Sequence, residues 1–231
     1  MALHGIGLVI FDCDGVLVDS EVIATRTLVA ELEKVGVSID DAYVATHFLG
    51  RSYRIAVDRI RADFGITLPE GFEAEYRARL VEAFRAGLTV MPHVREVIAQ
   101  LAVPYCLATS SSPERLRHSL SITGLDTLFA DRATTASEVA RGKPAPDIFL
   151  HAASKFAVAP ERCLVIEDSE PGIQGGLAAG MQVWRFTGGS HLAGMDLPAG
   201  PDATPHRVLA SFADFFRLVP DLRRQTTEIG R

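Results

Sequence analysis

The chain has 231 residues, of which 48% are hydrophobic, enough for one large domain or for a core with a smaller insertion. Its formal net charge of −6 comes from 23 Lys and Arg against 29 Asp and Glu, which gives no electrostatic reason to expect a nucleic-acid partner. No apolar run is long enough to cross a bilayer, and no cationic segment with a long apolar core opens the chain. We therefore expect a soluble, cytoplasmic protein that binds neither nucleic acid nor membrane.

The first apolar run, residues 8–11, predicts a buried strand that leads directly into Asp12 and Asp14. Side chains two residues apart on a strand point the same way, so both carboxylates can face one small volume. In an open α/β sheet this volume lies outside the carboxyl ends of the strands, where ligands bind. Buried carboxylates are costly unless something cationic or reactive meets them, so the pair indicates an active site. Gly15 lets the chain turn away immediately afterwards.

Helical periodicity dominates the next part of the chain. We expect helices over about residues 20–36, 53–64 and 72–84, and no convincing strand interrupts residues 20–87. The third helix carries an apolar stripe at intervals of four residues, formed by Phe72, Tyr76, Leu80 and Phe84. This stretch therefore predicts a helical insertion.

From Met91 onward, short apolar runs alternate with helical patterns. Strands are expected near residues 104–109, 130–134, 163–166 and 182–186. Helices are expected near residues 94–101, 113–123, 146–158 and 212–218, and another follows the strand at 163–166 and ends near Gly180. Strands that alternate with helices imply right-handed βαβ units and a parallel sheet, and hence an α/β fold. The three cysteines, Cys13, Cys106 and Cys163, fall within or beside these strands, so we expect them to be small buried hydrophobic residues.

Polar side chains also follow two later strands. Thr109 and Ser110 stand at a strand-to-helix transition, where hydroxyls and free N–H groups suit an anion such as phosphate, although a serine-rich helix cap has the same composition. Glu167 and Asp168 end another strand and offer the oxygen ligands that Mg²⁺ prefers, although Asp168 and Ser169 could instead cap a helix. Lys143 lies between them in a loop stiffened by prolines, where it is either solvated or supplies positive charge to phosphate. Together these stretches predict one site.

This combination resembles the haloacid dehalogenase-like phosphotransferases, in the branch that carries a helical cap after the first motif. The resemblance spans nearly the whole chain and rests on three motifs: Phe11-Asp12-Cys13-Asp14-Gly15-Val16-Leu17-Val18-Asp19-Ser20, Lys143-Pro144-Ala145-Pro146-Asp147 and Glu167-Asp168-Ser169. It implies a Rossmann-like, three-layer α/β/α core with a mostly parallel sheet, made of residues 1–17 and 88–231. An inserted α-helical cap of residues 18–87 would determine substrate specificity.

The resemblance implies a Mg²⁺-dependent phosphatase that hydrolyses a small phosphomonoester through an aspartyl-phosphate intermediate. Asp12 would attack phosphorus, because a carboxylate nucleophile divides one difficult displacement into two steps. Asp14 would protonate the departing alkoxide and then deprotonate the attacking water. The substrate would be a small phosphorylated metabolite, a sugar or sugar-acid phosphate such as 6-phosphogluconate, and the protein would be a monomer or a weak homodimer.

The resemblance also implies which residues hold the phosphate and the metal. The non-bridging oxygens would contact Thr109, Ser110 and Lys143. The ligands of Mg²⁺ would be a carboxylate oxygen of Asp12, the backbone carbonyl of Asp14, Asp168, and Glu167 either directly or through water.

Substrate choice would depend on the cap. Arg51 and Arg54 follow Gly50 at an expected turn, in the region where capped relatives touch their substrates. This arginine pair would bind a second anionic group, such as the carboxylate of a sugar acid, unless both side chains are simply solvated.

The main alternative activity is that of a β-phosphoglucomutase-type phosphosugar mutase, whose core motifs are nearly identical. The mutase pattern has a histidine where this chain has Ala24 and a cap arginine where it has Tyr53. A mutase must protect its phosphoenzyme from water, so both differences favour hydrolysis.

Three other activities fit the residues less well. A dehalogenase would not need Asp14 with an acidic metal cluster, and a phosphonatase would need a suitably placed cap lysine, whereas Lys34 lies near an expected helix end. A non-catalytic phosphometabolite-binding protein would bind without turnover, and the presence of both Asp12 and Asp14 argues against it.

Overall fold

The computed structural model describes residues 5–48, 53–195, 200 and 202–225, and six strands in this part of the chain form one parallel sheet. The strands are β1 (Leu8–Phe11), β2 (Tyr105–Thr109), β3 (Ala133–Thr135), β4 (Cys163–Glu167), β5 (Gln182–Phe186) and β6 (Arg207–Leu209), in the order β3-β2-β1-β4-β5-β6. β1 pairs with β2 on one side and with β4 on the other. The sheet therefore grows outward from β1 in both directions, and β1 stands at its topological switch point.

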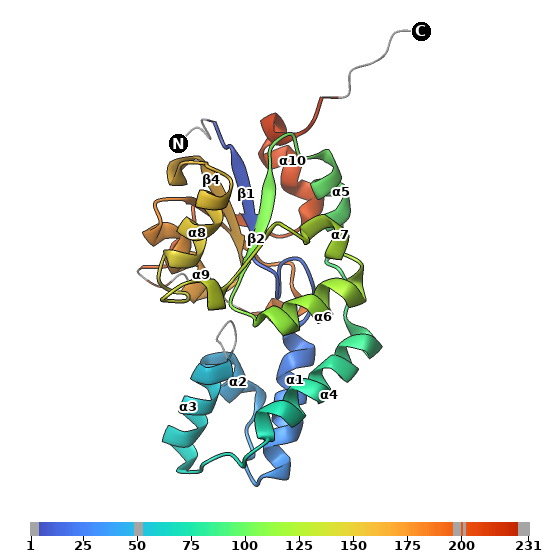
Figure 1. Ribbon diagram of the computed structural model, residues 1–231, viewed down its shortest axis with the longest axis vertical. Coiled ribbons are helices and arrows are strands. Elements are labelled where there is room, and N and C mark those ends of the chain that lie inside the picture. The colour runs from blue at the N-terminus through green and yellow to red at the C-terminus, as the bar shows by residue number, and fades with distance from the viewer. Residues whose placement is uncertain (1–4, 49–52, 196–199, 201, 226–231) are drawn as a thin grey trace.

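Helices cover both faces of the sheet, which gives the expected three-layer α/β/α fold (Figure 1). One face packs against α8 (Asp147–Lys155) and α9 (Glu170–Ala178), and the other against α5 (Val94–Gln100), α6 (Pro113–Thr123), α7 (Asp126–Phe129) and α10 (Phe215–Leu218). The central strand shows why both faces need cover. Leu8 and Ile10 of β1 are buried on the first face, whereas Val9 and Phe11 are buried on the second.

Four further helices form a layer beyond the carboxyl ends of the strands (Figure 1). They are α1 (Glu21–Lys34), α2 (Asp41–His47), α3 (Tyr53–Phe64) and α4 (Phe72–Gly87). The segments that enter and leave this layer lie side by side: Val18 forms an antiparallel bridge with Val90, and the Met91 N–H donates to the Leu17 carbonyl over 2.9 Å. The helical insertion is present as predicted, and the exact division at residues 17/18 and 87/88 stays a prediction.

The apolar patterns that predicted these elements are buried. All four residues of the stripe on α4 are buried, and so are Cys13, Cys106 and Cys163. Burial raises the pKa of the Cys13 thiol well above its usual value, which argues against a nucleophilic role. None of the described helices is both long and apolar enough to span a bilayer.

Three elements, α2, α7 and β6, were not predicted, and one strand was misplaced. α2 has seven residues and β6 has three, two of them exposed, so neither shows enough periodicity to be detected. The strand expected at 130–134 is instead Ala133–Thr135, because α7 occupies residues 126–129 and a turn follows, in which the Arg132 N–H donates to the Phe129 carbonyl over 3.0 Å.

Phe212 links β1 and β5 to the C-terminal segment, because its ring stacks on Phe186 at 4.7 Å and lies 6.1 Å from Phe11. We expect Phe212→Ala to lower the free energy of unfolding by about 3–5 kcal/mol, since it leaves a cavity among fully buried rings. Val208→Ala is the control, because Val208 is 54% exposed, and its effect should stay within about 0.5 kcal/mol. Urea unfolding of the three proteins tests this, and equal stabilities would contradict it.

Candidate active site

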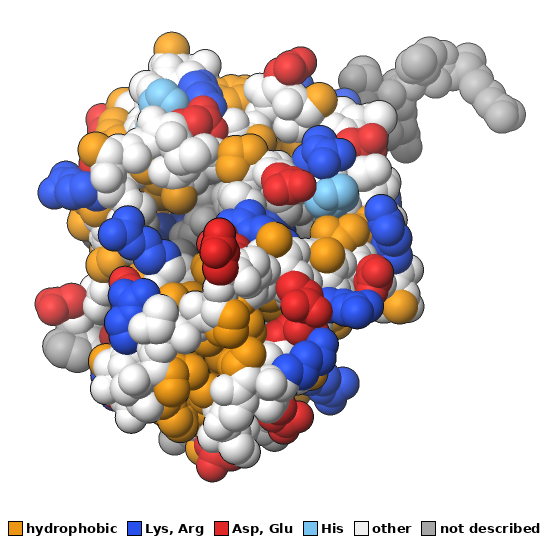
Figure 2. All heavy atoms as spheres, turned by 60° about the horizontal axis from the view of Figure 1, so that its bottom comes forward, with side chains coloured by type: hydrophobic (Ala, Val, Ile, Leu, Met, Phe, Trp, Pro, Cys, Tyr) orange, Lys and Arg blue, Asp and Glu red, His pale blue; other side chains and the backbone are white. Residues whose placement is uncertain are grey.

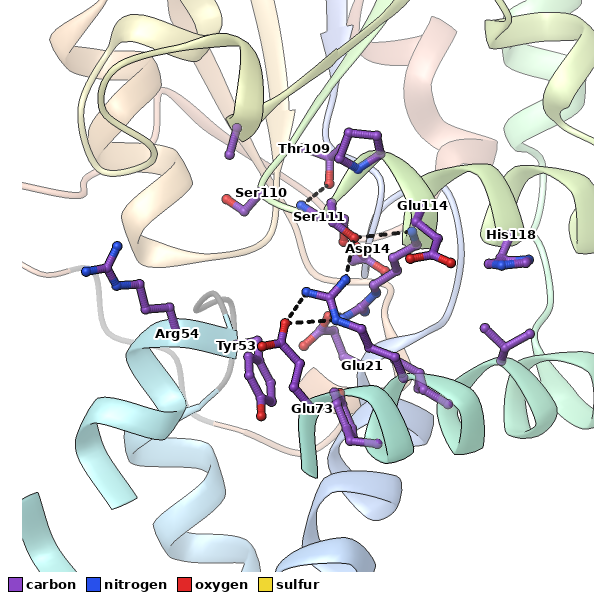
Figure 3. A pocket seen from close by; sticks show the side chains of 18 of the residues that line it. Asp14, Glu21, Tyr53, Arg54, Glu73, Thr109, Ser110, Ser111, Glu114 and His118 are labelled. Atoms are coloured by element: carbon purple, nitrogen blue, oxygen red, sulfur yellow. Dashed lines mark hydrogen bonds and ion pairs between the residues drawn. The ribbon is translucent and has the colours of Figure 1, made fainter. Parts of the chain in front are cut away.

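A cavity of about 1270 Å³ lies between the carboxyl ends of the strands and the helical layer (Figure 3). Because β2, β1 and β4 are neighbours, the residues that follow them meet at this edge of the sheet. Every described residue that the sequence singled out for the site lines this cavity: Asp12, Asp14, Arg54, Thr109, Ser110, Lys143, Glu167 and Asp168. Four distant stretches of the chain are therefore brought together.

Lys143 is buried at the floor of the cavity, with its side chain 3% exposed. Its ammonium group lies 2.5 Å from Asp12 Oδ1 and 2.7 Å from Glu167 Oε1, and it also donates to the Ala108 carbonyl over 3.1 Å. All three donor positions of the ammonium are therefore directed at the ends of β1, β4 and β2. Burial alone would lower the pKa of Lys143, but Asp12 and Glu167 raise it, so the side chain stays charged. The solvated interpretation of this lysine is wrong.

Asp12, Glu167 and Asp168 form a buried acidic cluster whose ligand oxygens lie within 4.8 Å of one another. Burial raises the pKa of Asp12 well above its usual value; Lys143 opposes this shift, and the other two acids add to it. Three buried carboxylates beside one ammonium group, which contacts two of them, leave an excess of negative charge. A divalent cation with oxygen ligands would balance this charge, so the donor set fits Mg²⁺.

The two ends of the cluster are held by different partners. Glu167 Oε2 accepts hydrogen bonds from the N–H and the hydroxyl of Ser169, over 2.7 and 2.9 Å. His191 Nε2 lies 2.9 Å from Asp168 Oδ2. Asp168 therefore does not cap α9, whose N-cap is Ser169.

Gly15 allows the turn after β1 to pass close to the acidic cluster. Its φ is +78°, and a Cβ at this position would lie 1.9 Å from Asp168 Oδ2. Any other residue would suffer both a strained backbone and a collision with this carboxylate. The turn thereby brings Asp14 over the same cavity as Asp12.

Both carboxylate oxygens of Asp14 are hydrogen-bonded. Oδ1 accepts from the Ser20 hydroxyl over 2.6 Å and from Arg115 Nη2 over 2.8 Å, and Oδ2 accepts from the Ser111 hydroxyl over 2.5 Å. Burial would raise the pKa of Asp14, but Arg115 and the two hydroxyls outweigh it and hold the pKa below its usual value. Asp14 is thus a carboxylate in this arrangement.

The serine-rich segment after β2 serves both of the functions that its composition allows. Ser112 is the N-cap of α6 and accepts from the Arg115 N–H over 3.3 Å. Ser110 and Ser111 instead face the cavity (Figure 3), and Thr109 is buried with its hydroxyl accepting from the Ser111 N–H over 3.1 Å. The hydroxyls and N–H groups beside Asp12 therefore form a polar wall suited to an anion.

The helical layer supplies the opposite wall. Arg54, in the first turn of α3, lines the cavity, but it is exposed and its side chain points away from Asp14 (Figure 3). Arg51 lies outside the described residues. Figure 2 shows this end of the molecule, where basic and acidic side chains are interspersed around a group of hydrophobic ones. Mixed charge of this kind does not by itself select an anionic substrate, so selectivity depends on individual residues.

Sequence reasoning missed three residues that contact the site: Ser111, Arg115 and His191. Ser111 and Arg115 lie in the segment that the sequence places at the end of β2 and in the first turn of α6, so their proximity to the site could have been inferred. No local signal marks His191, which follows β5 in an irregular segment.

Glu21, the first residue of α1, also lines the cavity, where it is partly buried. Burial raises the pKa of Glu21 to about 7; Asp14 adds to the shift and Arg115 opposes it. Below about pH 4.5 this carboxyl group is protonated in both the folded and the unfolded protein, so it does not change the free energy of unfolding. Between about pH 4.5 and 7 the unfolded chain loses this proton while the folded protein keeps it, so stability falls as the pH rises.

We expect Glu21→Gln to remove this pH dependence. The free energy of unfolding of the variant, minus that of the wild type, should increase from pH 5 to pH 8 by at most about 3 kcal/mol. Urea unfolding at both pH values, with a chelator present, measures the difference. Glu33→Gln, an exposed position on the same helix, is the matched control. A difference between Glu21→Gln and wild type that does not change with pH would contradict the assignment.

Comparison with known proteins agrees with this geometry. The family model described as haloacid dehalogenase-like hydrolase matches residues 6–180. The chain is 32% identical over 185 residues to 6-phosphogluconate phosphatase of Escherichia coli, covering 79% of this chain and 83% of that protein. It is 32% identical over 217 residues to a probable pseudouridine-5'-phosphatase of Drosophila melanogaster, with coverages of 89% and 90%. Hexitol phosphatase A of Escherichia coli is 31% identical over 179 residues, with coverages of 75% and 80%.

A solved structure also matches over almost the entire chain. It is a conserved haloacid dehalogenase-like protein of unknown function from Agrobacterium tumefaciens, with a TM-score of 0.78 and 33% sequence identity. The match covers 94% of this chain and 99% of that protein, so the two proteins share the same overall fold.

Proposed function

This chain belongs to the haloacid dehalogenase-like hydrolases and is a phosphatase, and we propose that it hydrolyses a small sugar or sugar-acid phosphate with Mg²⁺ through an aspartyl-phosphate intermediate. The observation that carries this proposal is the contact of Lys143 with Asp12 and Glu167, beside Asp168 and the hydroxyls of the β2 end. A nucleophile, an anion-binding wall and an acidic metal site then share one cavity.

In the first step, Asp12 attacks phosphorus and the ester oxygen leaves. Lys143 fixes the orientation of the Asp12 carboxylate and places positive charge where the phosphoryl oxygens arrive. Thr109 and Ser110 lie on the same side of the cavity and would bind the non-bridging oxygens. Catalysis of this kind depends mainly on positioning and on neutralising charge.

The residues that would hold Mg²⁺ are Asp12, Asp168 and the backbone carbonyl of Asp14, and the ion supplies positive charge to the transferring phosphoryl group. Both oxygens of Glu167 already accept hydrogen bonds, from Lys143 and from Ser169. We therefore assign Glu167 a contact through water.

Asp14 is the proton donor and acceptor in this proposal. It has to enter the first step protonated, and it gives this proton to the leaving oxygen. As a carboxylate it then takes a proton from water in the second step, which restores the protonated form. The hydrogen bonds from Ser20, Ser111 and Arg115 stabilise its carboxylate, which is the form needed to activate water.

For the substrate, a sugar-acid phosphate is the first candidate. The relatives named above act on 6-phosphogluconate, on hexitol phosphates and on pseudouridine 5'-phosphate, according to their names, so the leaving group varies within this group of proteins. Arg54 offers a cation on the cavity wall across from Asp14, where a carboxylate at the far end of a sugar acid could bind.

Replacing Asp12 by Asn tests the nucleophile. We expect phosphatase activity to fall by at least about 10³-fold, because the amide cannot form the phosphoenzyme. The wild type with Mg²⁺ should yield an acid-stable, hydroxylamine-sensitive phosphoprotein with ³²P-labelled substrate, and chelation should abolish turnover. Asp131→Asn, an exposed position, is the control. Activity in Asp12→Asn close to that of the wild type would refute the assignment.

Replacing Arg54 by Met tests substrate choice. We expect KM for 6-phosphogluconate to rise about 10- to 100-fold, the value of one charged hydrogen bond, with little change for a hexitol 6-phosphate. Arg59→Met is the matched control, because Arg59 lies on the same helix and pairs with Asp63. An equal change in KM for both substrates would show that Arg54 does not bind the carboxylate of 6-phosphogluconate.

The mutase alternative predicts a different product. Ala24 is buried in α1, and the Tyr53 ring stacks on Tyr76 at 5.6 Å, so neither position supplies the histidine or arginine of the mutase pattern. We expect glucose 1-phosphate, given with a sugar bisphosphate primer, to be hydrolysed or left unchanged. Efficient isomerisation to glucose 6-phosphate, measured with a coupled dehydrogenase assay, would show that the protein is a mutase and not a hydrolase.

A further inference from the structure

Arg115 is a half-buried cation at the boundary between the sheet and the helical layer, with its side chain 25% exposed. It belongs to the first turn of α6, and its Nη2 atom lies 2.8 Å from Asp14 Oδ1 and 3.8 Å from Glu21 Oε1. Its guanidinium carbon lies 5.5 Å from the centre of the Phe84 ring. The side chain therefore touches the turn after β1, helix α1 and helix α4 at once.

Its contact with Asp14 completes a clamp on both oxygens of that carboxylate. Arg115 and Ser20 bind Oδ1, and Ser111 binds Oδ2 from the opposite side. A carboxylate held by one oxygen can rotate about its side-chain bonds, whereas one held by both oxygens has a fixed direction. The clamp thus determines where the proton-carrying oxygens of Asp14 point.

The arginine is poorly suited to a purely structural role. Its Nε is buried and has no hydrogen-bond partner in the described part of the chain. A buried N–H without a partner costs about 1–3 kcal/mol, a cost that an apolar side chain against Phe84 would avoid. The hydrogen bond from Nη2 to Asp14 is the interaction that offsets the free energy lost at Nε.

The other basic side chains of the cavity wall have other partners or positions. Lys143 contacts Asp12 and Glu167, and Arg77 pairs with Glu73 and donates to Ser112. Arg115 is the basic residue that the structure places on Asp14.

We propose that Arg115 is a positioning residue, which holds the Asp14 carboxyl group toward the ester oxygen of the leaving group. This inference rests on the proposed function, in which Asp14 protonates that oxygen. Arg115 acts through Asp14 and need not touch the phosphoryl group. Its contribution to the rate should therefore depend on how strongly the leaving group requires protonation.

The leaving group provides the test. An alkoxide leaves only with a proton, whereas p-nitrophenolate leaves readily without one. We expect Arg115→Met to lower kcat/KM about 10²- to 10³-fold for a hexitol 6-phosphate and less than about 10-fold for p-nitrophenyl phosphate. The value of kcat/KM reports events up to the release of the leaving group, so the shared second step does not mask the difference.

Three further variants separate positioning from folding. Arg115→Lys keeps a cation in this place and should recover part of the lost activity toward the alkyl phosphate. Asp14→Asn should show the same selective loss as Arg115→Met, and adding Arg115→Met to it should cost little more. Arg95→Met is the matched control, because Arg95 binds the other end of α6 through the carbonyls of Thr123 and Gly124, and it should leave both activities unchanged.

Each contrary outcome has a distinct meaning. Equal losses on both substrates, or no loss on either, would overturn the positioning role of Arg115 while leaving the phosphatase proposal intact. If Arg115→Met does not fold, as judged by circular dichroism, Arg115→Lys alone decides, through a selective or an unselective loss. A wild-type protein inactive on every phosphomonoester would overturn the proposed function and, with it, this role.

Discussion

The ion cluster around Lys143 is the interaction on which the site depends. It joins the end of β1 to the end of β4 through Asp12 and Glu167, although Lys143 is 131 residues away from Asp12 in the sequence. Burying such charges is unfavourable unless they are paired, and here the negative charges outnumber the positive one. The fold therefore keeps a cluster that stability alone would not select. The cluster gives the Asp12 carboxylate a fixed direction and strongly attracts a cation, as the proposed mechanism requires.

The topology of the sheet makes this cluster possible. β1 lies between β2 and β4, so the residues that follow these three strands share one edge without any distortion of the chain. The turn at Gly15 passes close to Asp168 and places Asp14 over the same cavity. Side chains at the ends of adjacent, buried strands are held rigidly, and the helical layer faces them across the cavity.

The two sides of the cavity differ in how well the sequence predicted them. The strand ends were identified correctly, because an apolar run that stops at Asp, Glu or Thr is a strong local signal. Lys143 needed the additional inference that its proline-stiffened loop returns to the same edge. The partners of these residues were harder to find: Ser111 and Arg115 are ordinary helix-start residues by composition, and His191 lies in an irregular segment. The short elements α2 and β6 lacked enough periodicity to be recognised.

The sequence by itself determined the alternation of strands and helices, the parallel sheet, the helical insertion and the acidic and hydroxyl residues at the strand ends. These features follow from local periodicity and from abrupt changes between apolar and polar residues, which act over a few positions. The tertiary structure alone decided which side chains hold these residues in place: Lys143 between two carboxylates, His191 on Asp168, and Arg115 on Asp14. Such contacts join segments far apart in the chain, and their geometry depends on the packing of whole elements, which no local pattern encodes.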